Sequence, residues 1–162
     1  MNIFVTDPDP RKCAIALDDA RLRKMIVETA QLLSTALHEW GHEQAANVYK
    51  PTHRNHPCNL WARTRVANAR WLYEHLDAMG EEFRTRFDKS HKTHGLVVPF
   101  YAALRDLYDE EYNETSPFPN CTPYKEWDDV TEAYKQTLRD KWANDKRPPK
   151  WTNRELPEWI NG

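Results

Sequence analysis

A lysine and a glutamate stand four residues apart in the stretch "DDARLRKMIVETAQLL", at Lys24 and Glu28. At 100° per residue both fall on the polar edge of a helix with Arg21, beside an apolar face that includes Met25 and Leu32. An exposed pair of this kind contributes only about 0.2–0.5 kcal/mol to a helix. The same spacing would also suit an amine and a carboxylate at the rim of a pocket, where a carboxylate can move protons. Spacing alone favours the exposed ion pair.

A second group of chemically active side chains lies in "YKPTHRNHPCNLWAR", residues 49–63, where His53, His56 and Cys58 have spacings seen among metal ligands. A further His-x-x-His, in "HKTH", would complete a zinc site if the two loops met. Pro57 opposes this arrangement, because a proline at that position is typical of a helix start that points its neighbours apart. We therefore predict no metal and no cofactor, and a capped helix whose amino terminus contacts phosphate.

The tail "KWTNRELPEW" alternates aromatic and basic side chains, with Lys150, Trp151, Arg154 and Trp159 within ten residues. Aromatic rings beside basic groups can stack on bases and bind phosphates. Tryptophans can equally pin a tail to the core. Both interpretations remain open from the sequence.

The elements that must position these residues are helices. We predict an all-α fold: a compact single-domain helical bundle with long aromatic-rich loops and a short N-terminal extended segment, "NIFVT". Asp9 and Pro10 are typical of a helix start, Gly41 of a helix end, and Asn55 or His56 of a cap before Pro57. The helices are expected from residue 10, at 19–40, at 57–87 with a candidate kink at Gly80, at 100–112 and at 128–144.

Composition limits the class of protein. The 162 residues suit one domain, and three separated cysteines without a Cys-x-x-Cys pair favour a reducing compartment. We see no secretory signal and no membrane-length apolar stretch, and expect a cytoplasmic protein, in the host cell if phage-encoded. Charge is unevenly distributed along the chain despite the net charge of −2, because residues 44–73 contain five lysines and arginines and no acidic residue. Such a basic segment is compatible with a phosphate-bearing partner.

The stretches "LDDARLRKMIVETAQLL" and "HPCNLWARTRVANARWLYEHLDAMGEEFRTRF" resemble the pyrimidine-dimer DNA glycosylase family, the endonuclease V type of phage enzyme. The resemblance covers about residues 7–91. The order "YKPTHRNHPC", "HKTH" and "KWTNRELPEW" is similar to a longer phage-encoded branch. We therefore expect a glycosylase-like core at 1–95, followed by a helical extension and aromatic C-terminal tail at 96–162.

This resemblance implies a helical enzyme that flips a nucleotide out of DNA, where an amine attacks the sugar C1′ and a helix-borne glutamate assists. Glu28 matches that glutamate. In the family's best-known enzyme the nucleophile is the amine of a small second residue exposed after methionine removal, whereas this chain begins Met-Asn. Met1 or Lys24 would then supply the amine, with Lys24 partly buried, or Glu28 or Asp19 would activate water instead. The residues expected to contact substrate or DNA are Asp19, Arg21, Arg23, His53, Arg54, Asn55, His56, Arg63, His91, Lys150, Trp151 and Arg154.

The function predicted on this basis is a DNA glycosylase, with or without AP-lyase activity, acting on a damaged or modified base in DNA repair or base modification. Two alternatives remain. The same fold could act on a free nucleotide or a modified-base intermediate, or the chain could be a non-catalytic phage protein that binds nucleic acid. The expected partner is DNA or a nucleotide-like substrate, and no membrane; the sequence leaves the oligomeric state open.

Overall fold

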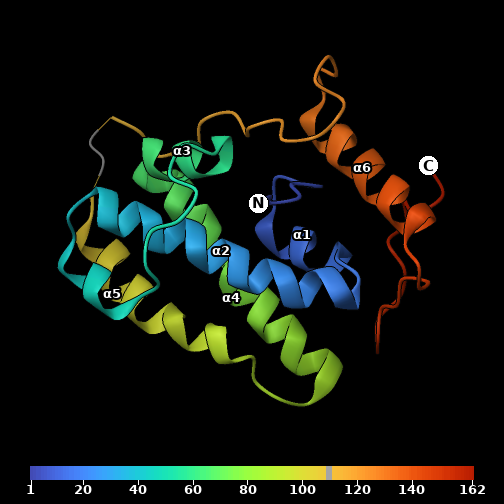
Figure 1. Cartoon of the computed structure of the whole chain (residues 1–162), viewed down its shortest axis with the longest axis horizontal. Coiled ribbons are helices and arrows are strands. Elements are labelled where there is room, and N and C mark those ends of the chain that lie inside the picture. The colour runs from blue at the N-terminus through green and yellow to red at the C-terminus, as the bar shows by residue number, and fades with distance from the viewer. Residues whose placement is uncertain (109–110) are drawn as a thin grey trace.

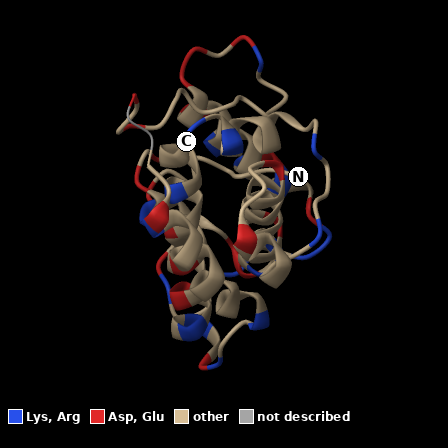
Figure 2. Cartoon of the chain, turned by 90° about the vertical axis from the view of Figure 1, so that its left-hand side faces the viewer, with Lys and Arg blue, Asp and Glu red and all other residues tan. Residues whose placement is uncertain are grey.

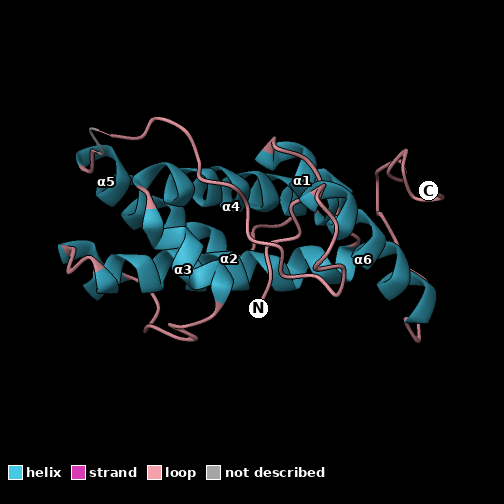
Figure 3. Cartoon of the chain, turned by 90° about the horizontal axis from the view of Figure 1, so that it is seen from above, coloured by secondary structure: helices cyan, strands magenta, loops and turns pink. Residues whose placement is uncertain are grey.

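The computed structural model of the protein describes residues 1–108 and 111–162. This part of the chain consists of helices joined by loops, without a strand (Figures 1 and 3). Its α-helices are α1 (Pro10–Ala16), α2 (Asp19–Glu39), α3 (Pro57–Thr64), α4 (Val66–Phe87), α5 (Val97–Asp106) and α6 (Val130–Asn144), and two short 3-10 segments are η1 (Glu43–Asn47) and η2 (Lys92–Leu96). The predicted all-α class and compact bundle are confirmed. The predicted N-terminal extended segment is a loop, in which the Asn2 side chain accepts the Ile3 and Phe4 N–H groups.

The core forms where α4 packs against α1 and α2, with α3 and α5 also in contact with α4. The apolar positions that recur at helical spacing in the sequence face this contact and are at most 1% exposed: Leu22, Ile26, Leu33, Leu72, Leu76 and Met79. Burial of each such side chain contributes about 1.5–3 kcal/mol. These contacts fix α2, the helix that carries Lys24 and Glu28. Within the described residues, no helix combines the length and apolar character that crossing a membrane requires.

Among the residues that the structure describes, side-chain caps start six of the helical segments, whereas α4 and α5 have no side-chain cap. The carboxylates of Asp9, Asp18 and Asp129 accept backbone N–H groups at the starts of α1, α2 and α6. Imidazoles do the same elsewhere: Nδ1 of His42, His56 and His91 accepts the N–H two residues further on, at 3.0, 3.1 and 3.2 Å. The prediction that Asn55 or His56 caps the helix after Pro57 is confirmed for His56. Only an unprotonated Nδ1 has the lone pair that such a cap needs.

The single helix predicted for residues 57–87 is wrong, because the chain breaks between α3 and α4 at Arg65, whose backbone is extended (φ −141°, ψ 146°). Asn68 stabilises the break. Its Nδ2 donates to the Trp61 carbonyl at 2.7 Å and to Ser116 Oγ at 2.8 Å, and its Oδ1 accepts the Ser116 N–H at 2.9 Å. The apolar periodicity continues on both sides of this break, so the periodicity alone could not reveal it.

Gly80 was a candidate kink, yet α4 runs through it from Val66 to Phe87. A Cβ atom at position 80 would lie 2.2 Å from Cγ of His94. The His94 ring is held in this place by Asp77, whose Oδ1 lies 2.8 Å from Nε2. The glycine therefore provides room for a side chain from η2 to pack against the helix.

The later helices are displaced from their predicted bounds. The helix expected at 100–112 is α5, which starts three residues earlier at Val97 and ends at Asp106. Pro99 therefore stands in its first turn, where a proline costs no intrahelical hydrogen bond. Residues 109 and 110 of that prediction lie outside the described residues. The helix expected at 128–144 is α6, which starts after the Asp129 cap.

Helix α6 and the C-terminal tail pack back onto the start of the molecule (Figure 1). The Trp142 indole donates to Asp18 Oδ1 at 2.8 Å, and the Trp151 indole donates to the Ala16 carbonyl at 3.0 Å. The two rings meet edge to face, 5.0 Å apart. The tryptophans of α6 and the tail thus hold the C-terminal residues against the turn between α1 and α2.

Candidate active site

The Glu28 carboxylate lies on α2 with its side chain 13% exposed. Its Oε2 accepts the Asn2 N–H at 3.1 Å, and its Oε1 lies 3.5 Å from Lys24 Nζ. Ile3 and Val5 are buried in the core directly after this contact. The N-terminal segment is therefore fastened on both sides of Asn2, and the first residue of the chain is held beside the carboxylate.

Lys24 does not have the partial burial that was expected for a substitute nucleophile, because its side chain is 71% exposed. The pair thus combines a shielded carboxylate with an exposed amine. Lys24 also lines a pocket of about 370 Å³ between α2 and the end of α6. The charged residues of this pocket are Arg21, Lys24, Lys141, Asp145, Lys146 and Arg147. With five basic residues and one acidic residue, the pocket is a local concentration of positive charge. On the face shown in Figure 2, by contrast, basic and acidic residues are interspersed.

Met1 connects α2 to the turn before α3. Its sulfur lies 3.5 Å from Asn59 Nδ2, which also donates to the Thr52 and His53 carbonyls at 2.8 Å each. The Asn59 side chain is fully buried, and its Oδ1 has no hydrogen-bond partner within the described part of the chain. The histidine-bearing turn and the N-terminal residue thus meet at one buried amide.

His56 lies in the electric field of this region. Burial lowers the pKa of its imidazole first, the positive N-terminal amine and His53 lower it further, and the Glu28 carboxylate acts in the opposite direction. The contacts of Asn2 with Glu28 and of Met1 with Asn59 place the N-terminus between this carboxylate and the start of α3. One acid, one amine and one imidazole therefore share a small region of the surface.

Two thiols complete the region. Cys58 Sγ, in the first turn of α3, lies 3.2 Å from Cys121 Sγ, in the proline-rich crossing between α5 and α6. The shared hydrogen bond and burial raise the pKa of Cys58, while the hydrogen bond that Cys58 donates lowers the pKa of Cys121. Cys121 was not predicted as a site residue, because 63 positions separate it from Cys58 along the chain.

Other residues expected to contact DNA already bind partners within the protein. Arg21 donates to Asp145 at 2.8 and 3.0 Å and to Asp18 at 3.1 Å. The Arg23 guanidinium lies over the Phe87 ring, 4.4 Å from its centroid. Arg23 is exposed and can exchange its ring contact for phosphate, whereas the Arg21 side chain is only 15% exposed and is bound to two carboxylates.

The turn before α3 is exposed. His53 Nδ1 and Thr52 Oγ1 are 2.7 Å apart, Arg54 pairs with Glu39 at 3.0 Å, and Arg63 donates to the Arg54 carbonyl at 2.9 Å. Asn55 is exposed between them. His91 is separate from this turn: its ring meets Phe83 edge to face at 5.0 Å, and burial lowers its pKa.

A third group lies at the start of α2. Both Asp19 oxygens bind Thr152, and Oδ1 also accepts Arg86 Nη1 at 3.1 Å. Lys150 is exposed, and its carbonyl accepts the Asp19 N–H at 2.8 Å. Asp19 is nine residues before Glu28, about 13 Å along the helix axis. The structure therefore separates Asp19 from the region around Glu28.

Arg154 and Trp151 contact the body of the protein in this same group. Arg154 makes two hydrogen bonds of 2.8 Å to Glu82, which also binds Arg86 at 2.8 Å, while Trp151 is buried. In these positions both side chains stabilise the tail.

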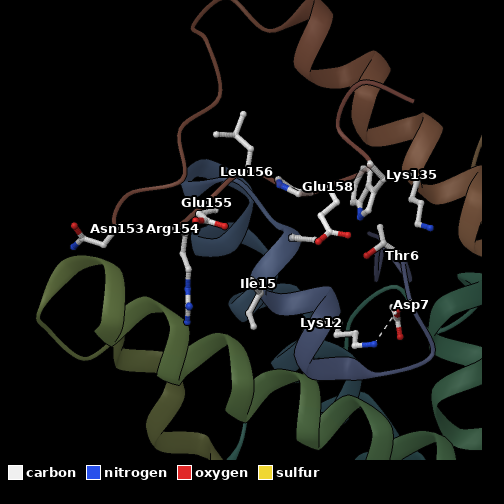
Figure 4. A pocket seen from close by; sticks show the side chains of 13 residues that line it. Thr6, Asp7, Lys12, Ile15, Lys135, Asn153, Arg154, Glu155, Leu156 and Glu158 are labelled. Carbon is white, nitrogen blue, oxygen red and sulfur yellow. Dashed lines mark ion pairs between the residues drawn. The ribbon is translucent and has the colours of Figure 1, made fainter.

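A cavity of about 720 Å³ lies between α1 and the tail (Figure 4). Basic residues such as Lys12 and acidic residues such as Glu155 and Glu158 both line it, and Lys12 pairs with Asp7 at 3.8 Å. Its lining does not include Glu28 or His56. This cavity is therefore separate from the region around Glu28.

The family model described as pyrimidine dimer DNA glycosylase matches residues 1–95 of the chain. The matched residues include Glu28, Lys24 and the turn before α3, and they end before α5. Searches of curated proteins and of solved structures gave no match.

Proposed function

Because the chain belongs to the pyrimidine dimer DNA glycosylase family, we propose that it releases a damaged or modified base from DNA with Glu28 as its catalytic carboxylate. The observation that supports this role is the position of Glu28: shielded from solvent, bound to the N–H of Asn2 and beside the histidine-bearing turn. No other carboxylate among the expected site residues has this combination, since Asp19 is occupied by Thr152 and Arg86.

The proposed chemistry follows from where charge develops. As the base leaves with the electrons of the glycosidic bond, C1′ becomes positive, and a carboxylate placed beside it stabilises that charge. An amine that attacks C1′ forms a carbon–nitrogen bond, loses its proton and, after the sugar ring opens, becomes a Schiff base. Glu28 would accept and return protons in these steps. The lyase activity depends on this amine.

The α-amino group of Met1 is our first candidate for the nucleophile. It belongs to the residue before Asn2, whose N–H is bound by Glu28. Lys24 is the second candidate, because its Nζ is 3.5 Å from Glu28 but its side chain is largely in solvent. If neither amine reacts, Glu28 activates a water molecule and the enzyme is a glycosylase without lyase activity.

We assign the DNA backbone to the basic pocket beside Lys24 and to the turn before α3. The pocket places Lys24 of the matched core next to Lys141, Lys146 and Arg147 of the extension. Exposed lysine and arginine side chains release counterions when they bind phosphates, so binding should weaken steeply with salt. Lys146→Glu should weaken binding and flatten its salt dependence, whereas Lys89→Glu, at an exposed residue outside the pocket, should not.

The decisive experiment compares wild type with Glu28→Gln on duplex DNA that carries a pyrimidine dimer or an abasic site. We expect Glu28→Gln to bind both duplexes and to lose base release or strand cleavage by at least 100-fold. Glu81→Gln, at an exposed carboxylate on α4, is the matched control and should retain activity. Full activity in Glu28→Gln would refute the catalytic assignment.

Borohydride trapping on abasic DNA identifies the amine. Loss of the trapped complex in Lys24→Ala selects Lys24, and loss after adding one residue before Met1 selects the α-amine. Base release without any trapped complex selects water.

A free nucleotide is the second candidate substrate, and the size of the basic pocket favours it. At about 370 Å³, the pocket is within the range of small-molecule sites. Base release from a mononucleotide, with no activity on duplex DNA, would select this alternative. Binding to DNA without base release on any substrate would instead indicate a non-catalytic protein.

A further inference from the structure

Three side chains with metal-binding atoms meet where the proline-rich crossing passes the start of α3. They are His56, Cys58 and Cys121, and one ligand atom of each lies within 4.8 Å of the other two. The crossing is held in this place from both sides, because Trp61 donates to the Ser116 carbonyl at 3.3 Å and the Tyr134 hydroxyl donates to the Pro119 carbonyl at 2.7 Å. The cluster therefore joins two segments that the fold already brings together.

We propose that His56, Cys58 and Cys121 bind one thiophilic divalent cation, Zn²⁺ being the ion that this donor set suits best. Two sulfurs and one imidazole are ligands that zinc prefers, and three protein ligands leave a fourth position for water or substrate. This proposal reverses the prediction of no metal made from the sequence, where the candidate ligands were His53, His56 and Cys58 together with the histidines of "HKTH". His53, His91 and His94 are not part of the cluster.

The sulfur positions are close to what zinc requires. Two zinc–sulfur bonds of about 2.3 Å at a tetrahedral angle separate the sulfurs by about 3.8 Å. The observed separation of 3.2 Å needs a small opening of the two side chains to reach that value. A disulfide would require a closure to about 2.05 Å.

The imidazole can supply its nitrogen at a small cost. Nδ1 of His56 now accepts the Cys58 N–H at 3.1 Å, so the proton of the neutral ring is on Nε2. Coordination through Nδ1 keeps that proton in place and replaces the cap hydrogen bond with a metal bond. A helix cap contributes much less free energy than ligation of zinc. Each thiol releases its proton to solvent as it binds, so uptake of one ion releases up to two protons.

The ion would fasten the crossing to the start of α3. Asn59, the residue after Cys58, lies 3.5 Å from the Met1 sulfur, and Glu28 accepts the N–H of Asn2. The N-terminal residues therefore connect the metal cluster to the proposed catalytic carboxylate.

The test is metal binding by the full chain, purified without a polyhistidine tag and stripped with a chelating resin under reducing conditions. Zn²⁺ is titrated against a chromophoric chelator, and Co²⁺ is added as a spectroscopic probe. We expect one Zn²⁺ per chain and a sulfur-to-cobalt charge-transfer band in the near ultraviolet. Neither readout depends on enzymatic activity.

Variants locate the site. Cys58→Ser and Cys121→Ser should each weaken Zn²⁺ binding at least 100-fold and reduce the cobalt band. His56→Asn should also weaken it, although asparagine preserves the helix cap. Cys13→Ser is the control, because Cys13 is buried elsewhere and its thiol donates to the Asp7 carbonyl. Wild-type binding no tighter than that of Cys121→Ser would overturn the proposal. A Cys58–Cys121 disulfide in place of stoichiometric metal would also overturn it and would identify a redox pair.

Discussion

Glu82 offers a sharp test of the packing between α4 and the tail. Its side chain is 3% exposed, and its carboxylate binds both Arg86, which is fully buried, and Arg154. Glu82→Gln keeps the shape of the side chain but leaves the Arg86 charge buried with one carboxylate fewer. Breaking a buried ion pair in this way costs about 3–5 kcal/mol.

The cost of Glu82→Gln should lie at the lower end of that range, because Arg86 retains its ion pair with Asp19 at 3.1 Å and its hydrogen bonds to the carbonyls of Leu17 and Ile15. We therefore expect a loss of about 3 kcal/mol in the free energy of unfolding. For a chain of this size, this corresponds to a fall in Tm of roughly 6–12 °C. Urea unfolding followed by circular dichroism measures the first quantity, and a thermal scan measures the second.

Glu81→Gln is the matched control, one residue away. The Glu81 side chain is 59% exposed and pairs with Arg11 at 3.4 Å, so its loss should cost about 0–1 kcal/mol. Equal losses for the two variants, or a loss below about 1 kcal/mol for Glu82→Gln, would refute the buried network.

At acid pH the difference in the free energy of unfolding between wild type and Glu82→Gln should become smaller. Burial alone would raise the pKa of Glu82, but the hydrogen bonds from Arg154 and Arg86 outweigh it and lower that pKa. A carboxyl group whose pKa is lowered by folding stabilises the protein above its unfolded value of 4.5, and this contribution is lost as the pH falls through the folded value.

Three further outcomes are expected. Burial lowers the pKa of His75 from 6.5 to about 4, so as the pH falls the unfolded chain binds a proton at this residue before the folded chain does. The free energy of unfolding of the wild type should therefore fall by up to about 3 kcal/mol between these pH values, and urea titrations of His75→Gln should lack this loss. Asn68→Ala leaves buried groups at the α3–α4 break unpaired and should lower the free energy of unfolding in urea by about 2–3 kcal/mol. Asn47→Ala, at an exposed residue, should lower it by less than about 0.5 kcal/mol. At pH 7, with metal removed, iodoacetamide should label Cys121 before Cys13, whose pKa burial raises to about 11; peptide mapping that shows equal labelling would contradict this.

The sequence predicted the features that depend on neighbouring residues. The Asp9 cap with Pro10, the His56 cap with Pro57 and the end of α2 before Gly41 follow from local chemistry. The buried face of α2 follows from its periodicity. The placement of Lys24 beside Glu28 also follows from helix geometry, but the burial of one and the exposure of the other do not, because neighbouring segments decide them.

Features that depend on distant residues could not be predicted. The break at Arg65 is stabilised by Ser116, 48 positions from Asn68. The role of Arg154 is decided by Glu82, a carboxylate 72 positions away along the chain. Cys121 belongs to the site only because the folded chain brings the crossing beside α3. In each case a side chain acquires its function from a contact that spacing along the chain does not encode.

The imidazole caps give this fold an uneven response to acid. The segments that start at His56 and His91 each depend on a lone pair that a proton would occupy, whereas α1, α2 and α6 start on carboxylates. Burial lowers the pKa of both imidazoles, so these two caps persist through neutral pH and are lost only as the pH falls below the ordinary range of histidine. Acid should therefore loosen the start of α3 and the segment after α4 before it loosens α6, where hydrogen bonds lower the pKa of the capping Asp129.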